Sequence, residues 1–141
     1  MITGRTRYLA SLLRQGTKMH ATILVIDDSQ MVRGQVRRAL AGAGFIVLEA
    51  ADGVEALATL VTNPETRLVI CDVNMPQMNG IEFLERLNED GIGIPVVMLT
   101  TEGQPELILQ AKKLGAKGWL IKPFKPEILV AAAKRLTASA A

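Results

Sequence analysis

Five polar side chains with complementary chemistry each stand directly after a short apolar run. The run "TILVI" is followed by Asp27 and Asp28, "RLVIC" by Asp72, "VVML" by Thr100, and "GWLI" by Lys122. Such runs are typical of buried parallel strands, whose carboxyl ends share one edge of the sheet, so these groups are expected to converge. Carboxylates, a hydroxyl and an ammonium in one crevice could bind a cation and accept a phosphoryl group.

The chemistry expected of this group follows from its charges. Three carboxylates placed close together repel one another, which raises their pKa values unless a cation lies between them. Mg²⁺ suits such a site because it takes one or two carboxylates, keeps several waters and leaves room for a phosphoryl oxygen. The ion and Lys122 together would balance the three negative charges. Asp72 could then act as a nucleophile toward phosphorus, with Thr100 donating a hydrogen bond to the phosphoryl group.

A lone aspartate at the position of Asp72 would be interpreted as a turn former, because aspartate is common in turns. The polar groups at the other strand ends favour a chemical role instead. Asp52 also follows a predicted strand, but an Asp-Gly pair before a helix is ordinary turn chemistry, so Asp52 is left out of the site.

The spacing of apolar and turn residues predicts the elements that carry these groups. Five strands alternate with five helices, and the strands are continuous apolar runs, as in a parallel sheet covered by helices on both faces. This pattern predicts an open, doubly wound α/β domain. The expected strands are residues 22–26, 45–50, 67–71, 96–99 and 118–121. The expected helices run from Ser29, as N-cap, to about Gly42, and over residues 54–61, 80–89, 105–114 and 126–137.

Length and composition limit the classes of protein that fit. A chain of 141 residues is long enough for one domain with one sizeable core. With a single cysteine, Cys71, and one histidine, it can form neither an internal disulfide nor a zinc site, and it fits a reducing cytoplasm. No apolar run approaches the roughly 20 residues of a membrane span, and no secretory signal is evident. We therefore expect a cytoplasmic protein that does not enter a membrane.

The charge distribution separates a short extension from the domain. The net charge of +2 is too small to indicate nucleic-acid binding. Residues 1–20 hold four basic and no acidic side chains, whereas the remaining 121 residues hold 12 basic and 14 acidic ones. We expect residues 1–20 to be a basic N-terminal extension, either disordered or artefactual, and residues 21–138 to form the domain.

Four motifs together resemble those of the response-regulator receiver domain. "VIDDS", "CDVNMPQMNG", "MLTTEG" and "KPF" occur in the order and spacing of that family, and the resemblance spans residues 22–137. The stretch "TTEGQPELILQAKKLGAKGWLIKPFKPE" looks most like the stand-alone, chemotaxis (CheY-like) branch. The resemblance implies a flavodoxin-like fold with strand order 2-1-3-4-5, and a cis peptide bond between Lys122 and Pro123.

The resemblance also implies a role for each candidate site residue. Asp72 would accept the phosphoryl group, and the Mg²⁺ ligands would be carboxylates together with one backbone carbonyl. The implied Mg²⁺ ligands are Asp27, Asp28 and Asp72, with Asp28 as a direct ligand, and the backbone carbonyl of Asn74. Thr100 would be the switch hydroxyl and Trp119 the switch aromatic. Lys122 would be the lysine that binds the phosphoryl group.

The function implied by the resemblance is a phospho-accepting response regulator of a two-component, chemotaxis-type system. It would take a phosphoryl group from a histidine kinase onto Asp72 and change its partner-binding surface. Such a protein is a signalling switch, not an enzyme, beyond self-catalysed phosphotransfer and autodephosphorylation. The implied partners are a chemotaxis-type sensor kinase, a downstream protein such as a motor switch component, and a phosphatase. We expect a monomer that binds no nucleic acid.

Two positions depart from the family pattern. Thr101 stands where the family usually has a smaller residue, so access to an acyl phosphate could be narrower. Trp119 replaces the usual tyrosine, so an inward rotation of the ring could be limited; an aromatic residue in a strand could also be plain core packing.

Two other functions use similar residues. A haloacid-dehalogenase-type phosphohydrolase also uses an aspartate nucleophile and Mg²⁺, but it needs a second aspartate two residues later, where this chain has Asn74. A pseudo-receiver that acts only as a scaffold would not need all five site residues, Asp27, Asp28, Asp72, Thr100 and Lys122.

Overall fold

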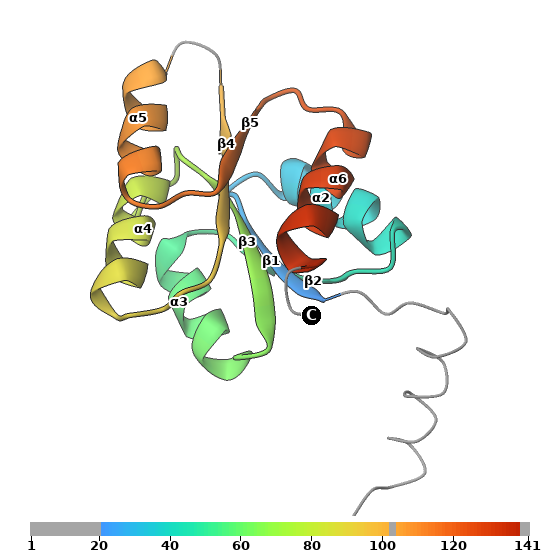
Figure 1. Cartoon of the computed structure of the whole chain (residues 1–141), viewed down its shortest axis with the longest axis horizontal. Helices are drawn as coiled ribbons and strands as arrows, with labels where there is room; N and C mark the ends of the chain where they lie inside the picture. The colour runs from blue at the N-terminus through green and yellow to red at the C-terminus, as the bar shows by residue number, and fades with distance from the viewer. Residues whose placement is uncertain (1–20, 102–103, 139–141) are drawn as a thin grey trace, which may run out of the picture.

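A computed structural model describes residues 21–101 and 104–138, so the expectations for residues 1–20 lie outside the described residues. Five strands and five helices alternate in this part of the chain (Figure 1). The strands are β1 (Thr22–Ile26), β2 (Ile46–Ala50), β3 (Thr66–Asp72), β4 (Val96–Thr100) and β5 (Gly118–Ile121). The helices are α2 (Gln30–Gly42), α3 (Gly53–Thr62), α4 (Gly80–Glu89), α5 (Pro105–Lys113) and α6 (Pro126–Thr137).

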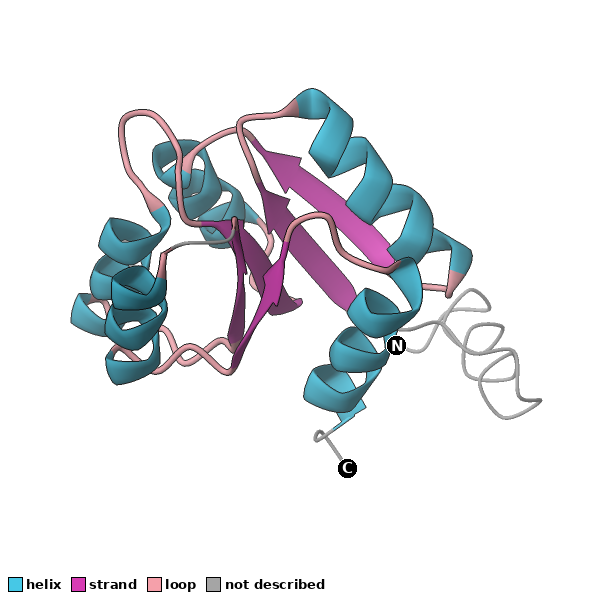
Figure 2. Cartoon of the chain, turned by 90° about the horizontal axis from the view of Figure 1, so that it is seen from above, coloured by secondary structure: helices cyan, strands magenta, loops and turns pink. Residues whose placement is uncertain are grey.

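The strands form one sheet in the order β2-β1-β3-β4-β5, and every neighbouring pair is parallel. The predicted fold class and strand order are therefore confirmed. Helices α2 and α6 cover one face of the sheet, and α3, α4 and α5 cover the other, so the sheet lies between two helical layers (Figures 1 and 2).

Strand alternation divides the core into two clusters, one on each face of the sheet. Leu24 and Ile26 of β1 belong to the cluster beneath α3, α4 and α5, whereas Ile23 and Val25 belong to the cluster beneath α2 and α6. The same alternation continues through β3 and β4, whose apolar residues are buried on both faces. The three inner strands are thus packed on both faces, so the residues at their carboxyl ends are held in fixed positions.

The two outer strands are less buried than their apolar sequences predict. Ile46 of β2 and Trp119 and Ile121 of β5 are exposed, although they lie in continuous apolar runs. Each of these strands has a neighbour on one side only, so the helices cover it incompletely. The expectation of strands buried on both faces holds for β1, β3 and β4 and is wrong for β2 and β5.

The helices begin where the sequence places capping groups. Ser29 accepts a hydrogen bond from the Val32 N–H at the start of α2, as predicted, and Asp52 accepts one from the Glu55 N–H at the start of α3. Pro105 and Pro126 occupy the first turns of α5 and α6. None of the helices in the described part of the chain is long and apolar enough to cross a membrane.

Candidate functional site

The five polar side chains singled out in the sequence lie at the carboxyl edge of the sheet. Asp27 and Asp28 follow β1, Asp72 and Thr100 are the last residues of β3 and β4, and Lys122 follows β5. The side chains of Asp27, Asp72 and Lys122 continue the alternation toward α2 and α6, because each follows by two residues a side chain of the cluster on that face. This shared face explains why one lysine reaches two aspartates.

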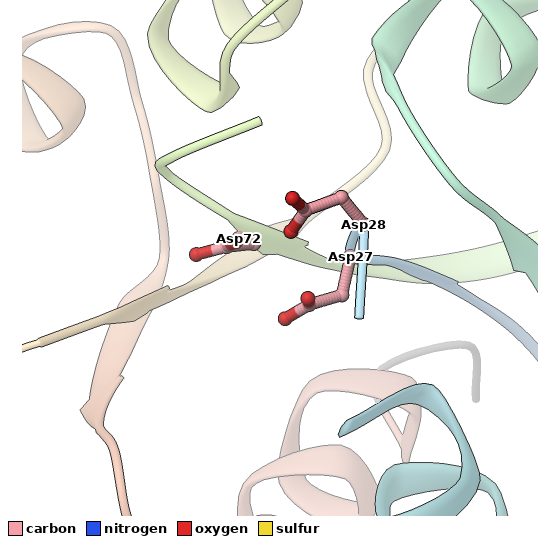
Figure 3. Close-up of side chains that lie close together, drawn as sticks. All are labelled: Asp27, Asp28 and Asp72. Atoms are coloured by element: carbon pink, nitrogen blue, oxygen red, sulfur yellow. The ribbon is translucent and has the colours of Figure 1, made fainter. Parts of the chain in front are cut away.

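The three carboxylates form a tight group. One oxygen from each of Asp27, Asp28 and Asp72 lies within 4.8 Å of the corresponding oxygens of the other two (Figure 3). Asp27 and Asp72 are buried, whereas Asp28 is exposed. The cluster therefore has two fixed acids at its base and one acid open to solvent.

Hydrogen bonds hold the two buried acids in place. The Lys122 ammonium lies 2.8 Å from Asp27 Oδ2 and 3.3 Å from Asp72 Oδ1. The Ser29 N–H donates to the other oxygen of Asp27 at 2.9 Å, and the Asn74 N–H donates to Asp72 Oδ1 at 3.4 Å. The predicted convergence of carboxylates and lysine is thus present, and the Lys122–Pro123 peptide bond is cis, as the resemblance implied.

The electrostatics of the cluster are unbalanced in favour of negative charge. The pKa of the Asp72 carboxyl is raised to about 6, first by burial and then by the neighbouring Asp27 carboxylate, while Lys122 opposes both effects. Burial lowers the pKa of the Lys122 ammonium, but its hydrogen bond to Asp27 and the charge of Asp72 outweigh this, so that the pKa lies above its ordinary value. Burial next to these acids also raises the pKa of the Cys71 thiol, which keeps it protonated and unreactive.

Thr100 contributes an unsatisfied group at the same edge. Its Oγ1 is fully buried and has no hydrogen-bond partner within residues 21–101 and 104–138. A buried hydroxyl without a partner is costly, so such a group in a native protein calls for an explanation. A ligand oxygen held above Asp72 would supply the missing acceptor.

The two departures from the family pattern lie close to Thr100. Trp119 pairs in register with Met98 and therefore shares a sheet face with Thr100, one strand away and two residues along the register. Its side chain is 37% exposed and lies on the outermost strand, away from the carboxylates. Thr101 is exposed, and its hydroxyl donates to Gln104 Oε1 at 3.2 Å. The roles expected of Trp119 and Thr101 stay predictions.

The loop that follows Asp72 is tied closely to the end of β3. The Gly80 N–H, at the start of α4, donates to the backbone oxygen of Val73 at 2.9 Å. A Cβ at Gly80 would lie 2.6 Å from the backbone oxygen of Asp72, so only glycine allows this approach. Asn79 caps α4 through a capping box with Glu82. The Asn-Gly pair of the sequence thus anchors the backbone that carries Asp72.

One contact of the site was missed by the sequence analysis. Arg33 of α2 donates to the backbone oxygen of Asp27 at 2.6 Å and to Glu49 Oε1 of β2 at 3.1 Å. Its position on the helix gives no signal, because an arginine there is equally compatible with a solvated face. Only the packing of α2 against β1 and β2 brings the guanidinium to the acidic residues.

Comparison with known proteins decides the family. The profile of the response regulator receiver domain matches residues 23–134. The chain belongs to this family.

This receiver domain is 39% identical over 110 residues to the chemotaxis protein CheY1 of Helicobacter pylori, across 76% of this chain and 89% of that protein. It is also similar to the solved structure of the chemotaxis protein CheY4 of Vibrio cholerae, with a TM-score of 0.76, 42% identity and coverage of 83% of this chain and 98% of that one. A putative response regulator from Chloroflexus aurantiacus aligns with a TM-score of 0.79 at 34% identity, over 86% of this chain and 99% of that one.

The family sets the broad function. The chain is a CheY-like response regulator receiver domain, a phospho-accepting signalling switch of two-component systems and not a classical enzyme. This finding decides against the haloacid-dehalogenase-type phosphohydrolase, for which Asn74 already lacked the necessary carboxylate.

Receiver domains bind Mg²⁺ in an acidic pocket, and the residues of this receiver fit that ion. All the clustered donors are carboxylate oxygens, which Mg²⁺ prefers. Burial is the main cause of the raised pKa of Asp72 and the Asp27 carboxylate the next, and a dication would offset the negative charge of these acids. Asp28 is exposed and so can reach an ion that keeps part of its water shell.

In the absence of divalent metal, we expect the stability of this receiver to fall as the pH rises from about 4 to about 7. The pKa of Asp72 is about 6 in the folded chain against 3.8 for an ordinary aspartate side chain, so the folded state binds more protons across this interval. The complete difference corresponds to at most about 3 kcal/mol of unfolding free energy at neutral pH. Urea denaturation with a chelator, repeated at several pH values, measures the decline, which Asp72→Asn should remove. Parallel pH profiles for wild type and variant would contradict this assignment.

Proposed function

We propose that this receiver takes a phosphoryl group from a chemotaxis-type histidine kinase onto Asp72, in the cytoplasm, and thereby changes a partner-binding surface. The observation that carries the proposal is that Asp72 lies beside Lys122 and two further carboxylates, at the edge where the Thr100 hydroxyl has no partner in the described residues. The similarity to CheY-type proteins supports the chemotaxis assignment.

The proposed transfer is a displacement at phosphorus. An Asp72 carboxylate oxygen forms the new P–O bond while the P–N bond of the kinase phosphohistidine breaks, and the imidazole keeps the electron pair and takes up a proton. Bound Mg²⁺, with Asp27, Asp28, Asp72 and the Asn74 carbonyl as proposed ligands, would supply positive charge that offsets the phosphoryl oxygens.

Three side chains of the receiver would act on the reacting group. Lys122 lies 3.3 Å from Asp72 Oδ1, so its ammonium is placed to bind a phosphoryl oxygen as that group arrives. Thr100 would turn its unpartnered hydroxyl toward another oxygen. The Asp27 carboxylate keeps Lys122 in place through the 2.8 Å ion pair. Hydrolysis by water would later return Asp72 to its carboxylate form.

The same movement would carry the signal away from the site. If Thr100 moves toward the phosphoryl group, it vacates space on the sheet face that it shares with Trp119. The half-exposed indole can enter that space and change the surface at β5 and α5. The size of the change depends only on the difference in indole packing between the two states.

We expect beryllofluoride with Mg²⁺, a mimic of the phosphoryl group, to change Trp119 fluorescence beyond the change given by Mg²⁺ alone. The only tryptophan of the chain is the reporter, so the signal is unambiguous. Thr100→Ala should remove the additional change, and Thr100→Ser, which keeps the hydroxyl, should retain most of it. A full response of Thr100→Ala would disprove the link between the hydroxyl and the ring, and Trp119 would then serve only in packing at the edge strand.

The partners remain proposals based on the relatives. A chemotaxis-type kinase would donate the phosphoryl group, a protein such as a motor switch component would receive the signal, and a phosphatase could end it. A phosphotransfer screen against the histidine kinases of the host would identify the donor. Failure of every kinase, together with no labelling by small phosphodonors, would favour the scaffold-only pseudo-receiver.

A further inference from the structure

Arg33 joins three parts of the fold at the base of the acidic cluster. Its side chain is 16% exposed; Nε donates to Glu49 Oε1 at 3.1 Å, and Nη1 donates to the backbone oxygen of Asp27 at 2.6 Å. One guanidinium therefore ties α2 to β2 and to the end of β1. The bond to Asp27 differs from the bond to Glu49 because its acceptor belongs to the peptide that links Asp27 to Asp28.

That peptide controls the direction of the exposed acid. The Asp27 carboxylate is held directly, by the Ser29 N–H and by Lys122. The Asp28 carboxylate makes no hydrogen bond or ion pair with any residue in the described part of the chain, so its backbone alone aims it at the cluster. In Figure 3 the side chains of Asp27 and Asp28 leave their consecutive residues on opposite sides. A small rotation of the peptide between them would move the Asp28 carboxylate away from Asp72.

We infer that Arg33 is a positioning residue for the cation site: by holding the Asp27 carbonyl, it fixes the peptide that aims the Asp28 carboxylate. The inference rests on the proposed use of Asp28 as a metal ligand. Glu49 supports Arg33, since it accepts from Nε and so fixes the plane of the guanidinium.

The sign of the effect separates positioning from simple electrostatics. Arg33 places a positive charge against the peptide between Asp27 and Asp28, so removing that charge alone would strengthen the binding of a cation. Removing a positioning contact would weaken it. The two interpretations thus predict opposite changes in Mg²⁺ affinity for the same substitution.

Arg37 provides a matched control. It lies one turn further along α2, carries the same charge and also pairs with Glu49, but it is 52% exposed and has no contact with Asp27 among the described residues. Arg37→Met therefore removes a positive charge and one Glu49 partner without touching the peptide between the acids.

The test is Mg²⁺ titration of the full chain by isothermal calorimetry, at neutral pH, for wild type, Arg33→Met, Arg33→Lys and Arg37→Met. We expect Arg33→Met to weaken Mg²⁺ binding by about tenfold or more, as the loss of a contact behind a metal ligand commonly does. Arg37→Met should bind as tightly as wild type or slightly more tightly. Arg33→Lys keeps the charge but can reach only one of the two acceptors, so its affinity should fall between these values.

Unchanged or tighter binding by Arg33→Met would overturn the inference, as would equal weakening by Arg37→Met. Circular dichroism without metal checks the fold of each variant. If Arg33→Met does not fold, Arg33→Lys decides alone, and wild-type affinity in that variant would overturn the inference. Absence of Mg²⁺ binding by wild type would instead remove the proposed metal site itself.

Discussion

Asp72→Asn is expected to take up no phosphoryl group from acetyl phosphate and Mg²⁺, whereas the wild-type receiver takes up one per molecule. The carboxamide is nearly the same size as the carboxylate, so the buried site keeps its shape, but its oxygen is a far weaker nucleophile toward phosphorus. Two acids lie next to Lys122, Asp27 and Asp72. Asp27 is already held by hydrogen bonds from Lys122 and from the Ser29 N–H, so Asp72 is the better candidate for the nucleophile. Intact-mass spectrometry under neutral conditions measures the uptake.

Asp52→Asn is the matched control for this loss. Asp52 also follows a strand, but its carboxylate caps α3 by accepting from the Glu55 N–H at 2.8 Å, and asparagine caps helices about as well. Asp52→Asn should therefore label as fully as wild type. Equal labelling of Asp72→Asn would mean that another residue accepts the phosphoryl group.

Lys122→Met is expected to destabilise the metal-free receiver at neutral pH by roughly 3 kcal/mol, because it leaves two buried carboxylates without their cation. Lys122 Nζ lies within 3.3 Å of Asp72 and 2.8 Å of Asp27, and its side chain is only 20% exposed. The loss should shrink toward pH 5, where the Asp72 carboxyl, whose pKa is about 6, already takes up a proton. If Lys122 has its proposed role, phosphoryl uptake should fall sharply as well, since no ammonium would be present to bind the arriving oxygen.

Urea denaturation and the rate of labelling by acetyl phosphate measure the two effects. Lys112→Met serves as the control, because Lys112 is exposed on α5 and makes no ion pair within the described residues. It should match wild type in both measurements. A Lys122→Met receiver as stable as wild type at neutral pH would show that Lys122 does not offset the charge of the buried acids.

The strand ends could be predicted from the sequence because two local signals coincide there. An apolar run marks each inner strand, and a polar residue marks the place where the strand leaves the core, so the edge that holds Asp72 and Thr100 could be placed to within one residue. The outer strands share the apolar signal but lack a neighbour on one side. Their exposure, and hence that of Trp119, depends on sheet order and helix coverage, which composition does not encode.

The contacts within the site could be predicted only in part. The motifs identify Lys122 and the acids, but the pairing of Lys122 with both Asp27 and Asp72 follows from the shared sheet face. The contact of Arg33 is harder to predict, since its partner at Asp27 is a backbone oxygen, which any residue type offers. No side-chain pattern could therefore have indicated that contact.

The ion pair between Lys122 and Asp27 joins residues 95 positions apart, at the ends of strands that are separated in the sheet by β3 and β4. During synthesis the acids emerge first, and the lysine follows only when most of the domain has left the ribosome. A nascent chain can therefore fold its early strands without acquiring a complete phosphoryl-accepting site. The receiver can accept a phosphoryl group only when the domain is nearly complete, so unfinished chains would not be phosphorylated.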